Sequence, residues 1–266
     1  MPRFHPIDDP ADPRIEAYRD IRERDLVGRQ GLFVAEGETV LRVLAGQDRH
    51  RPLSALIAAR RRDKLAPILD ALPAETPVYL AEQPVLDAVA GYPLHRGILA
   101  LARRAPDEDP EALLAGLGPD ALVLALMGVA NHDNMGGLFR NAAAFGADAV
   151  LLDPTCCDPL YRKAIRVSVG GVLRVPFATV PGDMVATLVR HGLTPIALSP
   201  SGETALHALA PPRRAALLLG AEGPGLPPET MARCRTVSIP MAAGFDSLNV
   251  ATTSGIALHH LRSAAG

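Results

Sequence analysis

Residues 121–146 read ALVLALMGVANHDNMGGLFRNAAAFG, and this stretch decides the fold class. Its first seven residues form an uninterrupted apolar run, which is typical of a strand covered on both faces of a sheet. A polar, glycine-containing segment follows and opens a helix. Gly146 ends that helix, since glycine is favoured just beyond a helix C-terminus. A buried strand that leads through a polar loop into a helix indicates a parallel α/β sheet.

The rest of the second half of the chain repeats this alternation. Further apolar runs lie at 149–153, 195–198 and 215–219, with a last strand near 236–239. Helical patterns lie at 135–145, 158–168, 183–191 and 247–263. The sequence therefore predicts a parallel α/β sheet over 120–266. In such sheets ligands bind beyond the carboxyl ends of the strands, so the loops there are the candidate site.

The first hundred residues predict a smaller α/β domain. A short apolar run at 32–34 leads through Glu36-Gly37 into a helix that ends at Leu44. Strands are expected at 53–58, 77–81 and 97–102, and further helices at 14–27, 63–72 and 83–90. Residues 105–119 are rich in Pro, Gly and charge, which favours a linker with room for one helical turn. The expected organisation is therefore a domain over 1–104, a linker over 105–119 and a second domain over 120–266.

Composition excludes several classes of protein. Of the 266 residues, 48% are hydrophobic and 21% are charged, which is ordinary for a globular chain and excludes disorder as its main state. The formal net charge of −2 excludes a globally basic nucleic-acid binder, although it allows a local basic face. No apolar run reaches the roughly 18–20 residues of a membrane span, and the N-terminus lacks the apolar region of a secretory signal.

Cysteine usage points to a reducing compartment. The three cysteines are too few for a disulfide framework, and two of them, Cys156 and Cys157, are adjacent and so poorly placed to share a metal. We expect reduced thiols, no metal and a cytoplasmic protein.

The first candidate motif is the segment Asn131–Asn141. Asn134 is a candidate helix cap, and the glycines at 136 and 137 allow close approach of backbone or ligand. Arg140 lies near the positive N-terminal end of the helix, where an anion or a phosphodiester could sit. An ordinary capped helix with a solvated arginine would have the same pattern.

The second motif, LGAEGPGL at 219–226, follows a buried strand and holds three glycines within six residues. It matches neither the dinucleotide-binding nor the P-loop pattern. Its bare backbone could contact a flat ligand such as adenine, with Glu222 as the single charge. A plain turn is the alternative.

The third motif joins Ile239-Pro240-Met241 to Asp246-Ser247-Leu248-Asn249-Val250. Asn249 is seldom needed in a first helical turn, so a hydrogen-bonding task is expected for it. Capping of the helix by Asp246 or Ser247 is the alternative.

In this order, and at strand ends, the three motifs resemble the SpoU (TrmH-type) branch of the SPOUT RNA methyltransferases. The family patterns N-x-G-x-x-x-R, G-x-E-G-x-G-L and I-P-M…S-L-N-V occur here at 134–140, 220–226 and 239–250, and the resemblance covers about 120–263. The stretch 162–170 is similar to an intervening segment of the family. Residues 33–37, FVAEG, resemble more weakly its N-terminal, L30e-like substrate-binding domain.

The resemblance implies methyl transfer from S-adenosylmethionine to a ribose 2′-hydroxyl of RNA. It also implies a trefoil knot in the C-terminal sheet and a homodimer with sites near its interface. By similarity the catalytic group comprises Arg140, Asn134, Glu222, Ser247 and Asn249. The cofactor would contact Leu198, Gly220, Ala221, Glu222, Gly223, Gly225, Ile239, Met241, Leu248 and Asn249.

The resemblance also implies positive surface that contacts RNA. The candidate basic groups are Arg14, Arg19, Arg22, Arg24 and Arg29; Arg60, Arg61, Arg62 and Lys64; and Arg162, Lys163 and Arg166. Ribosomal RNA is the first expectation for the substrate and tRNA the second. A catalytically inactive RNA-binding or assembly factor stays open, as does another enzyme with an adenine ligand. Intact Arg140, Glu222 and Asn249 argue against an inactive protein.

Overall fold

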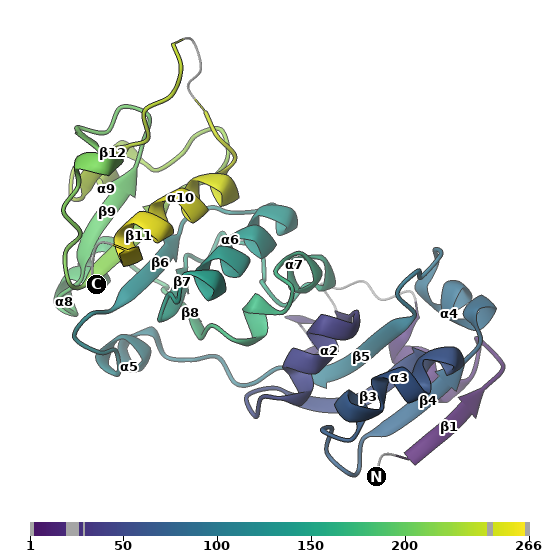
Figure 1. Ribbon diagram of the computed structural model, residues 1–266. Helices are drawn as coiled ribbons and strands as arrows, with labels where there is room; N and C mark the ends of the chain where they lie inside the picture. Colours follow the sequence, from purple (N-terminus) through teal and green to yellow (C-terminus); the bar gives the residue numbers. More distant parts are fainter. Residues whose placement is uncertain (1–2, 20–26, 29, 244–246, 264–266) are drawn as a thin grey trace. The chain divides into compact units, whose positions relative to one another are not determined.

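The computed structural model describes residues 3–19, 27–28, 30–243 and 247–263 (Figure 1). The chain forms two compact units. Unit 1 comprises 1–106 together with 160–174, and unit 2 comprises 107–159 together with 175–266. Among the described residues, no helix is both long and apolar enough to span a membrane.

Unit 1 is built on a five-stranded mixed sheet in the order β1-β4-β3-β5-β2. The strands are β1 (Arg3–Ile7), β2 (Leu32–Glu36), β3 (Arg51–Ala58), β4 (Pro77–Ala81) and β5 (Ile98–Arg103). β1, β4 and β3 run parallel, whereas β5 is antiparallel to both of its neighbours. Its helices are η1 (Pro13–Tyr18), α2 (Glu38–Ala45), η2 (Ala59–Arg61), α3 (Arg62–Leu69), α4 (Gln83–Ala90), α7 (Arg162–Val167) and η3 (Gly171–Leu173).

The predicted elements of this unit agree with the structure in position, with two differences. Strand β1 was not predicted, because five residues that include a proline carry little periodicity. Of the predicted helix 14–27, the structure describes a 3₁₀ helix over Pro13–Tyr18, and residues 20–26 lie outside the described part of the chain.

Unit 2 contains a seven-stranded parallel sheet in the order β10-β12-β9-β11-β6-β7-β8, which confirms the predicted sheet. The strands are β6 (Leu122–Leu126), β7 (Ala149–Leu152), β8 (Phe177–Thr179), β9 (Thr194–Leu198), β10 (Thr204–Ala205), β11 (Ala215–Leu219) and β12 (Arg235–Ser238). All residues of β6, β7 and β11 are buried, as their apolar runs predict. β8 and β10 are too short for a clear pattern. The predicted trefoil knot stays a prediction.

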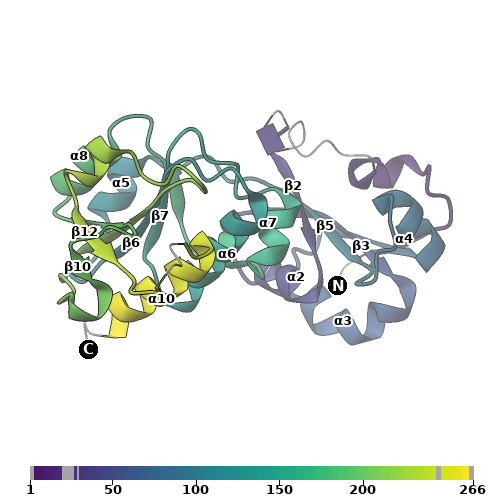
Figure 2. The same ribbon diagram turned by 90° about the horizontal axis from the view of Figure 1, so that it is seen from above.

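Helices cover both faces of this sheet. They are α5 (Pro110–Ala115), α6 (His132–Ala144), α8 (Met184–Arg190), η4 (Leu206–Ala208), α9 (Pro228–Met231) and α10 (Val250–Ser263). α5 and α8 cover one face, and α6 and α10 lie side by side on the other (Figures 1 and 2). The three cysteines are free, and burial raises the pKa of Cys156 to about 12, so its thiol stays protonated.

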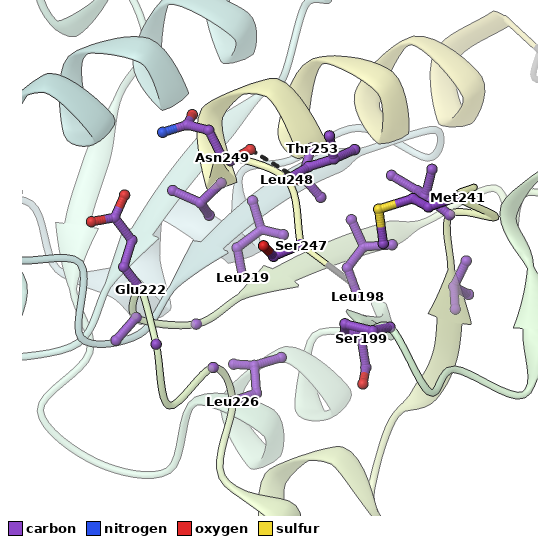
Figure 3. A pocket seen from close by; sticks show the side chains of 18 residues that line it. Leu198, Ser199, Leu219, Glu222, Leu226, Met241, Ser247, Leu248, Asn249 and Thr253 are labelled. Atoms are coloured by element: carbon purple, nitrogen blue, oxygen red, sulfur yellow. Dashed lines mark hydrogen bonds between the residues drawn. The ribbon is translucent and has the colours of Figure 1, made fainter. Parts of the chain in front are cut away.

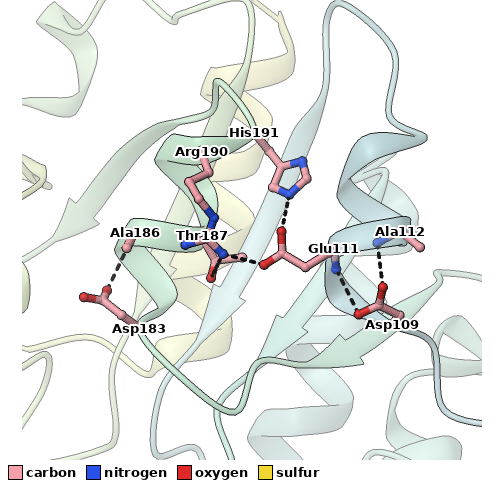
Figure 4. A network of polar contacts seen from close by, with 8 residues as sticks. All are labelled: Asp109, Glu111, Ala112, Asp183, Ala186, Thr187, Arg190 and His191. Carbon is pink, nitrogen blue, oxygen red and sulfur yellow. Dashed lines mark hydrogen bonds and ion pairs between the residues drawn. The ribbon is translucent and has the colours of Figure 1, made fainter.

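Residues 110–115, predicted within a linker, form helix α5 of unit 2. The Asp109 side chain caps this helix by accepting from the backbone of Ala112 at 3.1 Å. The Glu111 carboxylate then binds the end of α8: Arg190 donates to it, and Nε2 of His191 lies 2.8 Å from it (Figure 4). Hydrogen bonds from His191 and Arg190 lower the pKa of Glu111. Together with buried Leu114, this network attaches the predicted linker to unit 2.

Residues 160–174 differ from the predicted division, in which they belong with 120–266. Their contacts place them in unit 1. Glu36 of β2 is buried, and it forms ion pairs with Arg162, whose Nε is 3.9 Å away, and Arg166, whose Nη1 is 3.6 Å away. A buried carboxylate requires such partners. Arg162 and Arg166, two of the candidate RNA-binding arginines, therefore attach α7 to β2.

Candidate active site

A cavity of about 410 Å³ lies at the carboxyl end of the parallel sheet in unit 2 (Figure 3). This size falls within the range of small-molecule sites. The loops after β9, β11 and β12 and the start of α10 form its walls. All ten residues expected to contact a cofactor line it: Leu198, Gly220, Ala221, Glu222, Gly223, Gly225, Ile239, Met241, Leu248 and Asn249.

The glycine loop is a tight turn whose backbone faces this cavity. The amide of Gly225 donates to the carbonyl of Ala221 at 3.0 Å. A Cβ on Gly220 would stand 2.2 Å from the carbonyl carbon of Gly225, so only glycine fits there. Gly223 has a φ of +87°, which other residues rarely adopt. The sequence left two alternatives for this segment, a plain turn and a loop that contacts a ligand. The structure has both properties at once, because the tight turn also lines the cavity.

A chain of hydrogen bonds joins the three motifs at one end of the cavity. The side-chain amide of Asn134 donates to the Glu222 carboxylate. Oδ1 of Asn134 in turn accepts from Nδ2 of Asn249 at 2.8 Å. Asn134 is buried, so its amide has polar partners on both sides. Three residues that span 115 positions of the sequence thus form one polar network.

The prediction that Asn134 caps a helix is wrong. Asn131 caps α6 instead, accepting from the backbone of Asp133 at 2.8 Å and of Asn134 at 3.2 Å. The helix begins at His132, three residues earlier than predicted, and Asn134 lies in its first turn.

At the start of α10, Asn249 has both a capping and a bridging task. Its Oδ1 accepts from the backbone of Ala251 at 2.9 Å, and its Nδ2 reaches Asn134. Of the two alternative caps, Asp246 lies outside the described residues. Ser247 is exposed and lines the cavity.

Arg140 is the one predicted catalytic residue that the chain does not bring to the cavity. It lies on α6, is exposed and is absent from the cavity lining. Arg140 follows Asn134 by six residues, and at 3.6 residues per turn the two side chains leave the helix about 120° apart. Within the described part of the chain, its guanidinium forms no hydrogen bond or ion pair.

Two polar lining residues were not singled out from the sequence. Ser199 follows β9, so the rule that ligands bind beyond strand ends points to it. Thr253 lies one turn after Asn249 on α10, and its hydroxyl donates to the Asn249 carbonyl at 3.0 Å (Figure 3). Helical spacing from Asn249 would have identified it.

The electrostatics of the cavity favour a cationic ligand over an anionic one. Among its described lining residues, Glu222 is the single charged side chain. Leu198, Met241 and Leu248 provide apolar walls, and Glu222 and Met241 lie at opposite ends (Figure 3). A phosphate-bearing ligand would meet a carboxylate and no cation there. A flat, apolar group with a positive charge matches the cavity better. In the described residues, no cluster of His, Cys, Asp or Glu suited to a metal ion is present.

Comparison with known proteins identifies the family that these motifs indicate. The model of the SpoU rRNA Methylase family matches residues 121–259. An uncharacterized tRNA/rRNA methyltransferase of Mycobacterium tuberculosis is 40% identical over 268 residues, covering 94% of this chain and 89% of that protein. The 23S rRNA (guanosine-2′-O-)-methyltransferase RlmB of Acinetobacter baylyi is 32% identical over 216 residues, covering 76% and 85%.

Solved structures share the fold over nearly the whole chain. A crystal structure of an RNA 2′-O ribose methyltransferase superimposes with a TM-score of 0.81 at 26% identity, covering 98% of this chain and 99% of that one. An rRNA methyltransferase from Sinorhizobium meliloti gives a TM-score of 0.80 at 21% identity and 98% coverage of both chains.

Proposed function

Because the chain belongs to the SpoU rRNA methylase family of RNA methyltransferases, we propose that it methylates a ribose 2′-hydroxyl of ribosomal RNA in the cytoplasm. S-adenosylmethionine is the methyl donor in this family and supplies an activated methyl group on a sulfonium cation. Support for the 2′-hydroxyl comes from the relative RlmB, a 23S rRNA (guanosine-2′-O-)-methyltransferase.

The observation that carries this proposal is the cavity lined by the second and third motifs, with Asn134 of the first motif hydrogen-bonded to Glu222 and Asn249 in its wall. Its single charged side chain, Glu222, complements a sulfonium, and its bare glycine loop offers backbone groups to an adenine edge. The apolar side chains of Leu198, Ile239, Met241 and Leu248 suit the flat face of the base. The residues present therefore fit S-adenosylmethionine.

The chain's own residues must orient the ribose hydroxyl and remove its proton. We propose Glu222 as the proton acceptor, because Asn134 holds its carboxylate at one end of the cavity. Asn249 orients Asn134 in turn, and Ser247 adds a hydroxyl to the cavity lining. Much of the rate enhancement would come from alignment of donor and hydroxyl.

Arg140 is unsuited to accept a proton, since a guanidinium keeps its proton up to a pH of about 12. We propose that it holds an RNA phosphate and stabilises the developing alkoxide. Its position outside the cavity lining of its own chain accords with a homodimer whose sites lie near the interface.

The test begins with the ligand and continues with the product. S-adenosylmethionine should raise the unfolding temperature, whereas NAD and ATP should not. Tritiated methyl groups should then pass to ribosomal RNA from a strain that lacks the gene. The labelled nucleotide should resist alkaline cleavage, because a 2′-O-methyl group removes the attacking hydroxyl. Label confined to tRNA, or label on a base, would contradict the proposal. Cofactor binding without transfer to any RNA would identify an inactive factor.

A further inference from the structure

The carboxylate of Asp153 holds the loop that leads from β6 into α6, residues 127–131, which we call the β6 loop. Asp153 directly follows β7 and is partly buried, and both of its side-chain oxygens lie 3.1 Å from the backbone amide nitrogen of Gly128. Oδ1 also accepts from the backbone amides of Thr155 and Cys156, each at 3.0 Å, and from the Thr155 hydroxyl at 2.8 Å. With so many donors, the orientation of this carboxylate is fixed.

The hydrogen bond to Gly128 distinguishes Asp153 from an ordinary turn residue. The bonds from Thr155 and Cys156 lie within the turn that ends β7, and an aspartate commonly makes such local bonds. Gly128 is 25 residues away in the sequence and belongs to the loop of the neighbouring strand. An aspartate that only ended β7 would need no such partner.

The β6 loop is held between two other segments. On one side, the Cys157 amide donates to the Val129 carbonyl at 2.9 Å. On the other side, the Met127 amide donates at 3.0 Å to the carbonyl of Leu219, which immediately precedes the glycine loop at 220–225. This arrangement follows the strand order, in which β6 lies between β7 and β11.

Gly128 packs directly against the glycine loop. Its φ is +72°, and a Cβ on it would stand 3.1 Å from the Cβ of Ala221, so the two segments are in close contact. Ala221 lines the cavity and precedes Glu222. A shift of the Gly128 backbone would therefore move the residue next to the proposed proton acceptor.

The β6 loop also determines where α6 begins. Its last residue, Asn131, caps the helix, and Asn134 in the first turn donates to the Glu222 carboxylate. Both partners of this hydrogen bond are thus attached to the β6 loop. Asn134 is attached through α6, and Glu222 through the contact of its neighbour in the glycine loop with the start of the β6 loop.

We propose that Asp153 is a positioning residue for methyl transfer, which sets the placement of Asn134 against Glu222 by holding the β6 loop. This inference rests on the proposed function and on the role of Glu222 as proton acceptor. Asp153 is not among the described lining residues of the cavity, so it acts through the loop and not by contact with the cofactor. A remote displacement of about 1 Å can cost about 10²-fold in rate, because alignment of the reacting groups is what such a site supplies.

Asp153→Asn tests the bond to Gly128 with little change in shape. The amide oxygen of the new side chain can still accept from Thr155 and Cys156, whereas its NH2 group would face the Gly128 amide in place of Oδ2. Two donors then oppose each other, and the β6 loop shifts. At saturating S-adenosylmethionine, kcat for tritiated methyl transfer to ribosomal RNA should fall at least about tenfold, with KM for the RNA nearly unchanged.

Gly128→Ala disturbs the same contact from the other side, and it keeps the proposal testable where Asp153→Asn does not fold. A Cβ on Gly128 would meet Ala221, so the glycine loop must shift although Asp153 is unchanged. We expect a similar loss of kcat. A normal kcat in Gly128→Ala would show that this contact does not place Glu222.

A double-mutant cycle separates positioning from a general loss of structure. If Asp153 acts through the bond between Asn134 and Glu222, Asp153→Asn should change kcat by less than about twofold in an Asn134→Ala background. A purely structural role would lower kcat by the same factor in both backgrounds, and that result would contradict the proposal.

Asp148→Asn is the matched control. Oδ2 of Asp148 accepts from the backbone amide of Leu122 at 2.8 Å, at the opposite, amino end of β6. The substitution removes the same kind of bond from the same strand, so it should lower the unfolding temperature without changing kcat. Thr155→Val removes the hydroxyl bond to Asp153 but keeps the bond to Gly128, and its kcat should also be normal. Normal kcat in Asp153→Asn, or an equal loss in Asp148→Asn, would overturn the proposal.

A second readout needs no methyl transfer, so it separates this proposal from the proposed function. Backbone amide exchange, measured by mass spectrometry, should be faster in the glycine loop of Asp153→Asn than in that of the wild-type chain or Asp148→Asn, because the loop has lost its support. If the wild-type chain transfers no methyl group, faster exchange would still support the positioning role, and unchanged exchange would remove it. Methyl transfer by the wild-type chain, with unchanged kcat and exchange in Asp153→Asn, would remove the positioning role alone.

Discussion

Glu222 is a residue whose surroundings define its task. It is the single charged side chain among the described residues of a cavity walled by leucines and bare backbone, and an asparagine amide orients it. A carboxylate in such surroundings attracts a cation and can accept a proton.

At Gly223, substitution by valine should abolish binding of S-adenosylmethionine. The residue lines the cavity, so a side chain there would crowd the ligand, but its φ of +87° also makes any side chain strained. Gly91→Val is the matched control, because Gly91 has a φ of +76° and open space around it but lies at the end of α4 in unit 1. Both variants should lose some stability, and calorimetry should find cofactor affinity lost in Gly223→Val alone. Unchanged affinity in that variant would place the cofactor elsewhere.

Substitution of Arg140 should lower the rate of methyl transfer and leave the affinity for the cofactor unchanged. Arg140→Ala should keep nearly normal affinity for S-adenosylmethionine, since the residue is outside the cavity lining. It should lower methyl transfer at least about 10²-fold, the scale of removing one preorganised donor at a developing oxyanion. Arg140→Lys should restore little, because a point charge does not reproduce the planar fork.

The control for Arg140 is Arg235→Ala, which removes another exposed arginine of unit 2, at the start of β12. It should leave both measurements unchanged. Near-normal turnover in Arg140→Ala would remove the catalytic assignment, and lost cofactor binding would show that Arg140 supports the cavity instead.

At the scale of elements, the contact between α6 and α10 positions the cavity. Nδ2 of Asn141 donates to the Ala251 carbonyl at 2.6 Å and to the Ser254 hydroxyl at 2.9 Å. Gly137 faces Ala251 so closely that a Cβ on it would stand 2.6 Å from the Cβ of Ala251. Because Asn249 and Thr253 at the start of α10 line the cavity, this packing determines where one wall stands.

Gly137→Ala should therefore push α10 away from α6. Overpacking of this kind costs about 1–3 kcal/mol, which exceeds the gain of up to about 1 kcal/mol in helix propensity. We expect a lower free energy of unfolding by denaturant titration and weaker binding of S-adenosylmethionine by calorimetry. Gly182→Ala, with open space around it, should change neither quantity. A more stable Gly137→Ala variant would show that the two helices separate at no cost.

At the scale of the whole molecule, we predict a homodimer through the exposed side of α10. Leu258 and Leu261 of this helix are buried, whereas Ile256 is 42% exposed and Leu248, just before the helix, is 40% exposed. The helix thus carries more apolar surface than its own chain covers.

Ile256→Asp should shift the protein toward monomers in light scattering at micromolar concentration, because it places a charge in an apolar interface. Val189→Asp on α8 is the control, since Val189 is 55% exposed but lies on the other face of the sheet. A monomeric wild-type protein would overturn the prediction, as would an equal effect of both substitutions.

The sequence by itself determined the features that depend on local constraints. Buried parallel strands need continuous apolar residues, so β6, β7, β9 and β11 were visible as runs. The glycine loop was visible because its geometry excludes side chains at Gly220. Since the carboxyl ends of parallel strands share one edge, the loops there were expected to form one site, and the loops after β9, β11 and β12 line one cavity.

Only the tertiary structure decided which side chains meet across long separations in the chain. Asn134 had the pattern of a helix cap, yet it bridges Glu222 and Asn249, because Asn131 starts the helix one turn earlier. Arg140 shares a motif with Asn134 but leaves α6 in another direction. The 160–174 segment follows a strand of unit 2 but joins unit 1, since Glu36 is buried there and requires cations. The local sequence pattern indicates backbone conformation and burial. Which side chains contact one another depends on the packing of residues that are far apart in the sequence.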